Sequence, residues 1–201
     1  GGAVADGAAG EAAAGDEVIV VTGDRIAQPA GSATAAVTVI DRVAIAGAPA
    51  VLADELVRSA PIVGTFRRSA STAADPTSQG LNLRGLGPSG VSRALVLRDG
   101  VPLNDPFGGW VYWRGLSALA IERIEIVPSG ASALFGNAAL GGVLHVVSRP
   151  IAPAGAAQVD AEAAAGTLGT LRAAARVADQ RAGLGVELTV DALRTAGYAP
   201  I

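Results

Sequence analysis

Four groups of residues in this 201-residue chain have types and spacings that could support chemistry. The first is GLGPSG at 85–90, which matches the glycine fingerprint of dinucleotide-binding folds. That fingerprint needs a helix whose N-terminus meets the pyrophosphate, whereas RALVLRDG at 93–100 predicts a strand that ends in a turn. The sequence therefore argues against a nucleotide site.

His145 is the only histidine of the chain, and it lies in the strand-like run VLHVV. A serine or threonine nucleophile would need it as a general base, but no G-x-S-x-G nucleophile elbow accompanies it. One histidine without any cysteine also disfavours a transition-metal site. We expect His145 to make an ordinary hydrogen bond within a strand.

Two pairs of acidic residues are the remaining candidates for catalysis. Asp99 and Asp105 flank a turn, and turn chemistry explains both, since Asp99 precedes a glycine and Asp105 a proline. Glu122 and Glu125 have odd spacing in one predicted strand, so they point to opposite faces and cannot share a substrate as glycosidase carboxylates do. The sequence shows no catalytic machinery, and we expect neither an enzyme nor a cofactor.

Composition narrows the function classes further. All 15 basic residues are arginine and the net charge is −3, so the chain has no basic excess that would attract nucleic acid. With no cysteine, there is no disulfide framework. Half of the residues are apolar, but Ala and Gly dominate and only 3% are aromatic, which is unusual for a compact soluble enzyme. The absence of methionine predicts a mature, trimmed or partial chain.

One segment without charged residues, 126–148, has the length of a membrane-spanning helix. Pro128, Gly136 and the glycine pair at 141–142 interrupt this segment. We therefore expect a turn, a short helical piece and a strand here, and no spanning helix.

Local patterns predict the elements that would position these residues. Residues 1–15 are mostly Gly and Ala and predict a flexible tail, and the β-branched run DEVIVVTG at 16–23 predicts an extended segment. A strand is expected at 35–40, ending at Asp41. Strands and glycine turns then alternate, which favours a mixed sheet with a few helices; the strand-like runs are LNLR, RALVLRDGVPL with a turn at Asp99 and Gly100, IERIEIV and VLHVVSR.

The run VLADELVRSA between Pro49 and Pro61 predicts a short amphipathic helix. Its apolar positions recur at helical spacing, and Pro61 stops it. The expected inward residues are Leu52, Leu56 and Val57, and the expected outward residues are Asp54 and Glu55.

After Pro150 and Pro153 the pattern changes to three runs of alternating polar and apolar residues, separated by glycine-containing turns. This change predicts a domain boundary. The alternation indicates strands with one apolar and one polar face, as in a membrane barrel with a wet lumen, although a half-buried soluble sheet would look the same. The polar positions are Gln158, Asp160 and Glu162, then Arg172 and Arg176, then Glu187, Thr189 and Asp191.

Three stretches between Gln79 and Pro150 together resemble the plug of TonB-dependent outer-membrane receptors. They are QGLNLRGLG, RALVLRDGVPLNDPFGGWVYW and IERIEIVPSGASALFGNAALGGVLHVVSRP. Upstream, DEVIVVTG at 16–23 is similar to the energy-coupling box, or TonB box, of such receptors. The resemblance implies an α+β plug domain followed by the first strands of an antiparallel transmembrane β-barrel. The chain would be truncated, because a membrane barrel needs at least about eight strands and only three follow Pro153.

The resemblance divides the chain into a tail at 1–15, a coupling segment at 16–23, a plug at 24–150 and barrel strands at 151–201. It implies a gate for energy-coupled uptake of a scarce ligand, such as a siderophore, another chelate or cobalamin, across the outer membrane of a Gram-negative bacterium. The implied partners are TonB with its inner-membrane energising complex, an extracellular small-molecule ligand and the outer membrane, with the N-terminus in the periplasm. The alternative is a non-energised pore or structural barrel, which would lack the coupling segment.

The resemblance also suggests residues for each task. The β-branched coupling residues could add as a strand to a partner sheet, or could simply form the first strand of the plug; they are Glu17, Val18, Ile19, Val20, Val21 and Thr22. Arg84, Arg123 and Glu125 would present charges to the barrel wall, or would be solvated strand charges. Family plugs usually have Arg-Gly where this chain has Pro128 and Ser129, so Arg84 and Arg123 could take over that contact.

Four of the seven aromatic residues lie close together in a Gly- and Pro-containing loop; they are Phe107, Trp110, Tyr112 and Trp113. A concentration of large rings in a loop suggests a contact surface, because binding residues often lie on loops. These side chains are therefore candidates for stacking on a bulky ligand or for packing against the barrel wall.

Overall fold

The computed structural model of the chain describes residues 37–65, 71, 79–85, 92–128, 135–153 and 157–197, and the backbone of 20–21 and 28–29. The predicted tail at 1–15 and four of the predicted coupling residues, Glu17, Val18, Ile19 and Thr22, lie outside the described residues.

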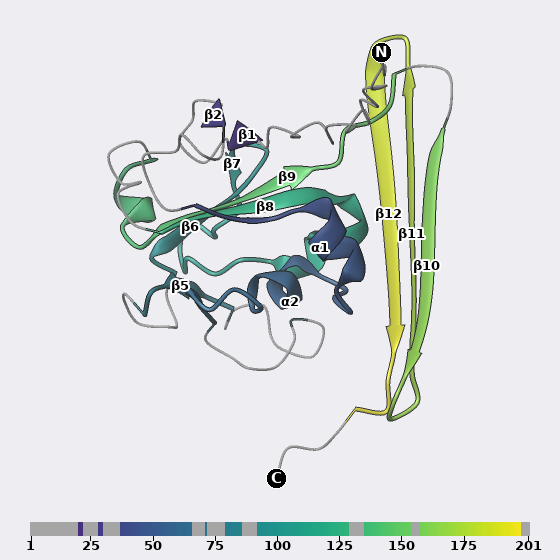
Figure 1. The fold of residues 1–201 in the computed structure, drawn as a ribbon, viewed down its shortest axis with the longest axis horizontal. Coiled ribbons are helices and arrows are strands. Elements are labelled where there is room, and N and C mark those ends of the chain that lie inside the picture. The colour runs from purple at the N-terminus through teal and green to yellow at the C-terminus, as the bar shows by residue number, and fades with distance from the viewer. Residues whose placement is uncertain are drawn as a thin grey trace, which may run out of the picture.

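A mixed five-stranded sheet forms the centre of the N-terminal domain (Figure 1). Its strands are β3 (Thr38–Ile40), β6 (Ala94–Arg98), β7 (Val101–Pro102), β8 (Ile121–Pro128) and β9 (Gly142–Ser148). They are ordered β3-β8-β9-β6-β7, with β6 parallel to β9 and the other neighbours antiparallel. Most residues of β6, β8 and β9 are buried, because other parts of the chain cover both faces of the sheet.

Two short helices and their neighbours cover one face of this sheet (Figure 1). These elements are α1 (Arg42–Gly47), α2 (Ala53–Val57), the two-stranded sheet of β4 (Val63–Thr65) and β5 (Leu81–Leu83), and the 3-10 turns η3 (Trp113–Gly115) and η4 (Ala118–Ala120). α1 begins where the Asp41 Oδ1 atom accepts a hydrogen bond from the Ala44 N–H at 2.8 Å, which satisfies one free donor of the first turn. The main core fills the layer between them and includes Leu56, Val96 and Leu144.

The opposite face of the sheet carries a smaller apolar cluster that contains Leu95, Leu97, Val127 and Val143. The 3-10 turn η5 (Asn137–Ala139) contributes Ala139 to it. On this side, β1 (Val20–Val21) pairs antiparallel with β2 (Gln28–Pro29) (Figure 1). Two of the predicted coupling residues therefore lie in a very short strand pair within the chain.

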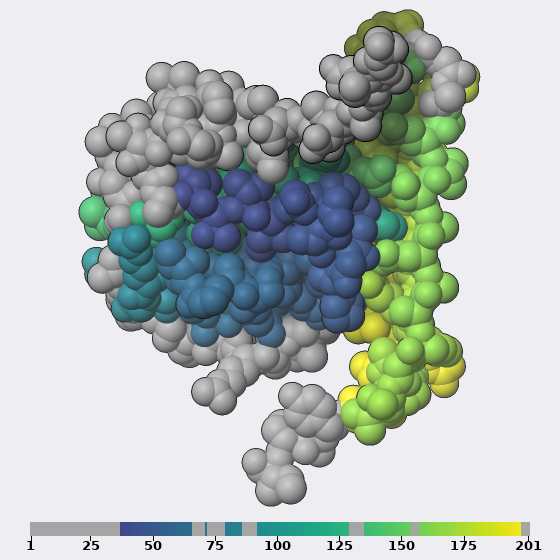
Figure 2. Space-filling view, in the orientation of Figure 1, coloured from purple at the N-terminus to yellow at the C-terminus, as the bar shows by residue number. Residues whose placement is uncertain are grey.

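Three long strands stand beside the N-terminal domain and extend past it at both ends (Figure 1). They are β10 (Gln158–Gly166), β11 (Thr170–Arg181) and β12 (Leu184–Arg194), which form an antiparallel sheet in chain order. The surface of the N-terminal domain lies directly against this sheet (Figure 2). The predicted fold class, an α+β domain followed by three strands after Pro153, is confirmed.

The predicted strands and turns largely coincide with the observed ones. The β6–β7 hairpin turns at Asp99 and Gly100, whose φ angles are 48° and 83°. The described part of 126–148 holds the end of β8, η5 and β9. Among the described residues, no helix has the length and apolar character needed to cross a membrane.

Two details of the helical layer differ from the expectation. α1 was not predicted, because a six-residue helix is too short for a clear apolar period. The prediction that Asp54 points outward is wrong, since its side chain is buried. Its carboxylate accepts hydrogen bonds from the Ser71 hydroxyl at 2.6 Å, the Ser71 N–H at 3.0 Å and Arg58 Nη2 at 2.8 Å, and these contacts compensate the loss of water.

Candidate functional site: a charged interface between two sheets

The sheet of β10–β12 turns its polar face toward the N-terminal domain and its apolar face away from it. Side chains alternate between the faces of a strand, so Val186, Leu188 and Val190 all point outward and are more than half exposed. On the inward face of β11, Ala174, Arg176 and Ala178 are buried. The predicted polar and apolar faces are thus confirmed, and the polar face is the one that meets the N-terminal domain.

Arg176 lies at the centre of this interface and its side chain is fully buried. Its Nε donates to Glu187 Oε2 on β12 at 2.6 Å, and its Nη1 lies 3.3 Å from Asp160 Oδ2 on β10. Nη1 also reaches Gln158 Oε1 at 3.5 Å. Arg176 therefore links all three strands through their inward polar side chains.

Two arginines of the N-terminal domain bind the same two carboxylates. Arg149, just after β9, donates from Nη1 to Asp160 Oδ2 at 2.8 Å. Arg98, at the end of β6, has its Nη2 3.6 Å from Glu187 Oε1. The ion pairs run in the order Arg98, Glu187, Arg176, Asp160 and Arg149, with charges that alternate in sign. We call these five residues the shared-carboxylate network.

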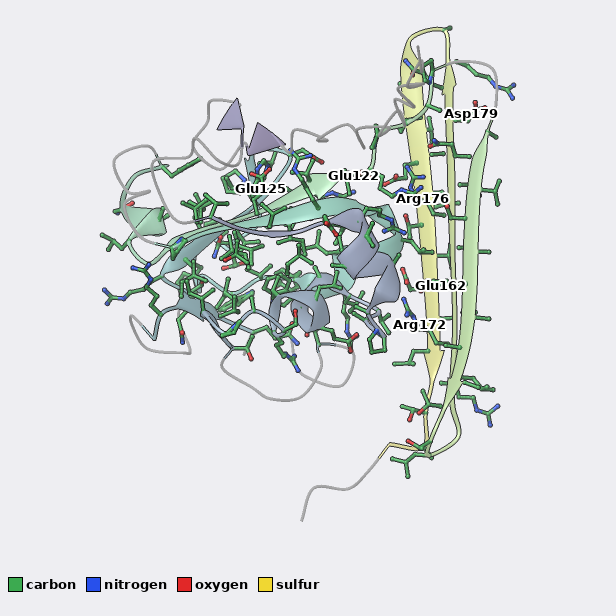
Figure 3. All side chains as sticks on the ribbon, in the orientation of Figure 1. Glu122, Glu125, Glu162, Arg172, Arg176 and Asp179 are labelled. Carbon is green, nitrogen blue, oxygen red and sulfur yellow. The ribbon has the colours of Figure 1, made fainter. Side chains whose placement is uncertain are left out.

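Further contacts extend the interface along the sheet (Figure 3). Arg172 Nη1 donates to the Ala50 carbonyl at 3.1 Å, and its Nη2 forms an ion pair with Glu162 Oε1 at 2.5 Å without hydrogen-bond alignment. The Ser117 hydroxyl lies 3.1 Å from Asp191 Oδ1 on β12. Each of the three strands therefore contributes at least one polar side chain to the interface.

Arg42, the first residue of α1, lies close to charged residues of this interface. Arg42 Nη1 donates to the carbonyls of Ala118 and Ile121 at 2.9 and 3.0 Å. Burial lowers the pKa of the Arg42 guanidinium, and the nearby charge of Arg149 lowers it further. Glu122 and two carboxylates of β10, on Asp160 and Glu162, act in the opposite direction and favour the charged form.

The predicted wall-contact residues lie elsewhere in the N-terminal domain. Arg123 Nε donates to Glu125 Oε1 at 2.8 Å, and Glu125 Oε2 lies 3.6 Å from His145 Nδ1. Glu125 is fully buried, which excludes a solvated strand charge at that position. Arg84 is exposed at the turn after β5, with φ 56°. A contact of these residues with other barrel strands stays a prediction.

The four aromatic candidates have different environments. Trp113 is buried in the main core, where its Nε1 donates to the Gln79 carbonyl at 3.3 Å, so its assignment as a ligand contact is wrong for this conformation. Phe107 is 97% exposed and Tyr112 is 52% exposed. The ring of Trp110 lies over Gly108, where an added Cβ would clash with the ring. Large rings fill space when a core is within reach, and Trp113 is the one that reaches it.

Phe107 is held outward by a closely hydrogen-bonded loop. The Asp105 Oδ1 atom accepts from the N–H groups of Phe107 and Gly108 at 2.9 and 2.8 Å. Asn104 ties the loop to β6, because its Oδ1 accepts from the Val96 N–H at 2.7 Å. Phe107 is thus exposed on a loop with a defined conformation.

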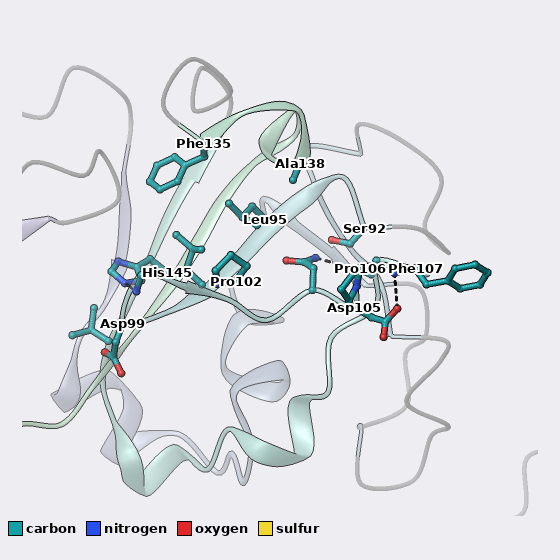
Figure 4. A pocket seen from close by; sticks show the side chains of 15 residues that line it. Ser92, Leu95, Asp99, Pro102, Asp105, Pro106, Phe107, Phe135, Ala138 and His145 are labelled. Carbon is teal, nitrogen blue, oxygen red and sulfur yellow. Dashed lines mark hydrogen bonds between the residues drawn. The ribbon is translucent and has the colours of Figure 1, made fainter. Parts of the chain in front are cut away.

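A cavity of about 980 Å³ lies on the face of the sheet opposite the helices (Figure 4). Leu95, Pro102 and Phe135 supply apolar lining, and His145 and Asp105 lie at its two ends. The polar groups have partners in the protein, since His145 Nε2 accepts from the Gly100 N–H at 3.2 Å and Asp105 holds its own loop. In the described part of the chain, no three His, Cys, Asp or Glu side chains gather as a metal site.

The network residues were not identified as a site from the sequence. The sequence indicates that the strand residues lie on a polar face, but it does not indicate which residues of the N-terminal domain they contact. The alternation placed Asp160, Arg176 and Glu187 together on a polar face. Nothing in the local pattern indicated that Arg98 and Arg149, more than ten residues from any of them, would meet that face.

A family model described as TonB-dependent Receptor Plug Domain matches residues 29–143, more than half of the chain. The chain therefore belongs to the TonB-dependent receptor plug family. From here on the N-terminal domain is called the plug and the sheet of β10–β12 the wall sheet, which corresponds to the start of the barrel.

Curated relatives are several times longer than this chain. The vitamin B12 transporter BtuB of Vibrio vulnificus is 29% identical over 135 residues, which cover 67% of this chain and 21% of the relative. The rhizobactin receptor of Rhizobium meliloti is 34% identical over 135 residues, which cover 66% of this chain and 17% of the relative. The chain thus spans about a fifth of the length of these relatives.

Solved structures show the same fold. The ferric citrate transporter FecA in its unliganded form aligns with a TM-score of 0.65 and 22% identity, covering 88% of this chain and 28% of that one. The ferric yersiniabactin uptake receptor FyuA from Yersinia pestis aligns with a TM-score of 0.59 and 19% identity, covering 83% and 25%. At these identities the likeness concerns the fold alone.

Proposed function

We propose that this chain is the plug and first barrel strands of an outer-membrane receptor that gates energy-coupled uptake of a scarce ligand of the cobalamin or siderophore class. The observation that carries the proposal is a family plug seated on the polar face of a sheet whose other face is apolar. An apolar outer face suits lipid and a polar inner face suits a water-filled lumen. Relatives named as vitamin B12 and rhizobactin receptors support the ligand class.

The coupling partner in this proposal is TonB with its inner-membrane energising complex, which would pull on residues 16–23 from the periplasm. A β-branched segment can add as a strand to a partner sheet, and the backbone hydrogen bonds then resist pulling. In the part of the chain that the structure describes, Val20 and Val21 pair with Gln28 and Pro29, and a partner strand would replace this pairing. The tail at 1–15, the plug at 24–150 and the barrel strands at 151–201 complete the proposed division.

The ligand would meet exposed aromatic side chains of the plug. Phe107 and Tyr112 are available for such contact, and Trp110 supports the loop that carries Phe107. Among the remaining proposed wall contacts, Arg84 and Arg123 would meet further strands of the barrel, and the fully buried Glu125 would hold Arg123 in place for that contact. No cofactor is part of this function.

Deletion of residues 16–23 from the full-length receptor tests the energy-coupled function. Uptake of radiolabelled cobalamin and of a panel of ferric siderophores would be measured in whole cells, together with binding of the same ligands at the cell surface. We expect uptake of the cognate ligand to be lost while binding remains. Deletion of 1–15, the matched control, should preserve both. Unchanged uptake after deletion of 16–23 would instead support the non-energised pore.

A further inference from the structure

Arg176 of the wall sheet shares both of its carboxylate partners with the plug. Asp160 Oδ2 is the acceptor for Arg149 Nη1 at 2.8 Å and for Arg176 Nη1 at 3.3 Å. Glu187 offers Oε2 to Arg176 Nε at 2.6 Å and Oε1 to Arg98 Nη2 at 3.6 Å. Two carboxylates therefore serve three guanidinium groups.

The seated plug leaves Arg176 in an unfavourable environment. Its side chain has no exposed surface, so its charge has lost its water. Its Nη2 is buried and has no hydrogen-bond partner. Arg98 and Arg149 bring two further positive charges to the same acids, and charges of one sign repel more strongly away from bulk water. All three effects would weaken if the plug withdrew.

The wall-sheet members of the network would stay together after withdrawal of the plug. Asp160 and Arg176 are direct cross-strand partners of β10 and β11, and Glu187 lies on the adjacent strand β12. Arg98 and Arg149 belong to the plug and would leave with it. The carboxylates would keep Arg176 as their partner, and its free Nη2 could reach water or the vacated oxygens.

We propose that Arg176 promotes release of the plug by competing with Arg98 and Arg149 for Asp160 and Glu187. In this role it is a positioning residue of the gate. Its competition keeps the free energies of the seated and the withdrawn plug close to each other. The inference rests on the proposed function for its biological meaning. The competition itself is a property of the contact between plug and wall sheet, so it can be tested without a ligand or an energy source.

The test measures access to the wall sheet behind the plug in the full-length receptor. Ala174 is a small residue on the inward face of β11, 4% exposed beneath the plug, and residues 1–201 contain no cysteine. An Ala174→Cys reporter should react with a membrane-impermeant thiol reagent only when the plug moves away. Labelling rates would be followed in detergent over a series of urea concentrations that leave the barrel folded.

In the reporter background, Arg176→Gln should slow labelling about fivefold, because the acids then pair with the plug arginines alone. Arg98→Gln and Arg149→Gln should each accelerate labelling about threefold, as expected for partly exposed pairs. Arg181→Gln is the matched control on the same strand and should leave the rate unchanged, since Arg181 is exposed and, among the described residues, forms its ion pair with Asp179 of its own strand.

Equal or faster labelling of the Arg176→Gln variant would overturn the proposal and make Arg176 an ordinary structural link. Heat-dependent mobility of the barrel on gels confirms folding of each variant. If Arg176→Gln does not fold, Arg176→Lys serves as the second variant: it keeps the charge but lacks the unpartnered Nη2 donor, and it should slow labelling about twofold. A wild-type rate for that variant would also overturn the proposal. Loss of energy coupling in the 16–23 deletion leaves these rates untouched, so the two proposals fail separately.

Discussion

At the scale of single residues, the buried charge of Glu125 has partners whose positions are fixed by the sheet. Glu125 is fully buried on β8, between Arg123 on the same strand and His145 on β9. His145 Nε2 accepts from the Gly100 N–H, which confirms the ordinary hydrogen bond expected of the only histidine. These contacts join the β6–β7 turn to the centre of the sheet.

Replacement of Glu125 by Gln should therefore destabilise the plug. The substitution keeps the size of the side chain but removes the buried carboxylate charge that pairs with Arg123 Nε, which costs about 3 kcal/mol for a buried pair. The change in the free energy of unfolding of the plug is measured by urea unfolding of the full-length receptor, monitored through hydrogen exchange of the β8 and β9 amides. Glu122→Gln on the same strand is the control and should change the free energy of unfolding by less than about 0.5 kcal/mol. Equal effects at both positions would contradict this account of Glu125.

The aromatic loop shows how far residue types alone can be interpreted. Trp113 and Phe107 lie six residues apart in one loop and were assigned the same role. One fills the core and the other is almost fully exposed. The difference is that the Trp113 ring enters the core between the sheet and the helices. Packing between segments that are far apart in the sequence decides which ring enters this core.

At the scale of elements, most strands could be predicted because their signal is local. A strand buried on both faces is a continuous aliphatic run, and a strand at a polar–apolar boundary alternates with period two. β6 follows the first pattern and β12 the second, whereas charged residues interrupt β8, whose Ile and Val residues still indicate a strand. α1 has only an aspartate N-cap as a local signal, at Asp41, and its six residues contain too few turns to show a period.

The outward face of β12 leads to a prediction for this element. Leu188 is 63% exposed on that face, and in the proposed receptor it contacts lipid. Leu188→Arg should destabilise the folded barrel by about 2–4 kcal/mol if the residue lies near the middle of the bilayer. Leu188→Ala, which keeps the face apolar, is the control. Folding into vesicles of defined phosphatidylcholine, measured by urea titration, gives the difference. A negligible effect of the arginine would mean that this face does not contact lipid.

At the scale of the whole molecule, the plug is held against the wall sheet by polar contacts. The Arg98, Arg149, Arg172 and Ser117 contacts all cross the interface between the two parts. Ion pairs and single hydrogen bonds exchange readily with water, unlike an interdigitated apolar core. An interface of this kind suits a domain that must be held firmly and also be moved.

Neutralisation of one network acid should weaken this attachment. Glu187→Gln removes the closest partner of the buried Arg176, at a cost of about 2–3 kcal/mol in the stability of the assembled receptor. Asp179→Asn is the control, because its partner Arg181 is 87% exposed, and it should have an effect within about 0.5 kcal/mol. Calorimetric melting of the full-length receptor distinguishes the two variants. A control as destabilising as Glu187→Gln would show that burial of Arg176 is not the cause.

The sequence by itself determined the strands, the turn at Asp99 and Gly100, the two faces of β10–β12 and the family resemblance. Each of these depends on neighbours within a few residues or on a contiguous pattern. Only the tertiary structure decided that Asp54 is buried, that Trp113 enters the core and that Arg98 and Arg149 meet Asp160 and Glu187. Side-chain burial and ion pairing depend on segments brought together by folding, and residue spacing along the chain does not specify which segments those are.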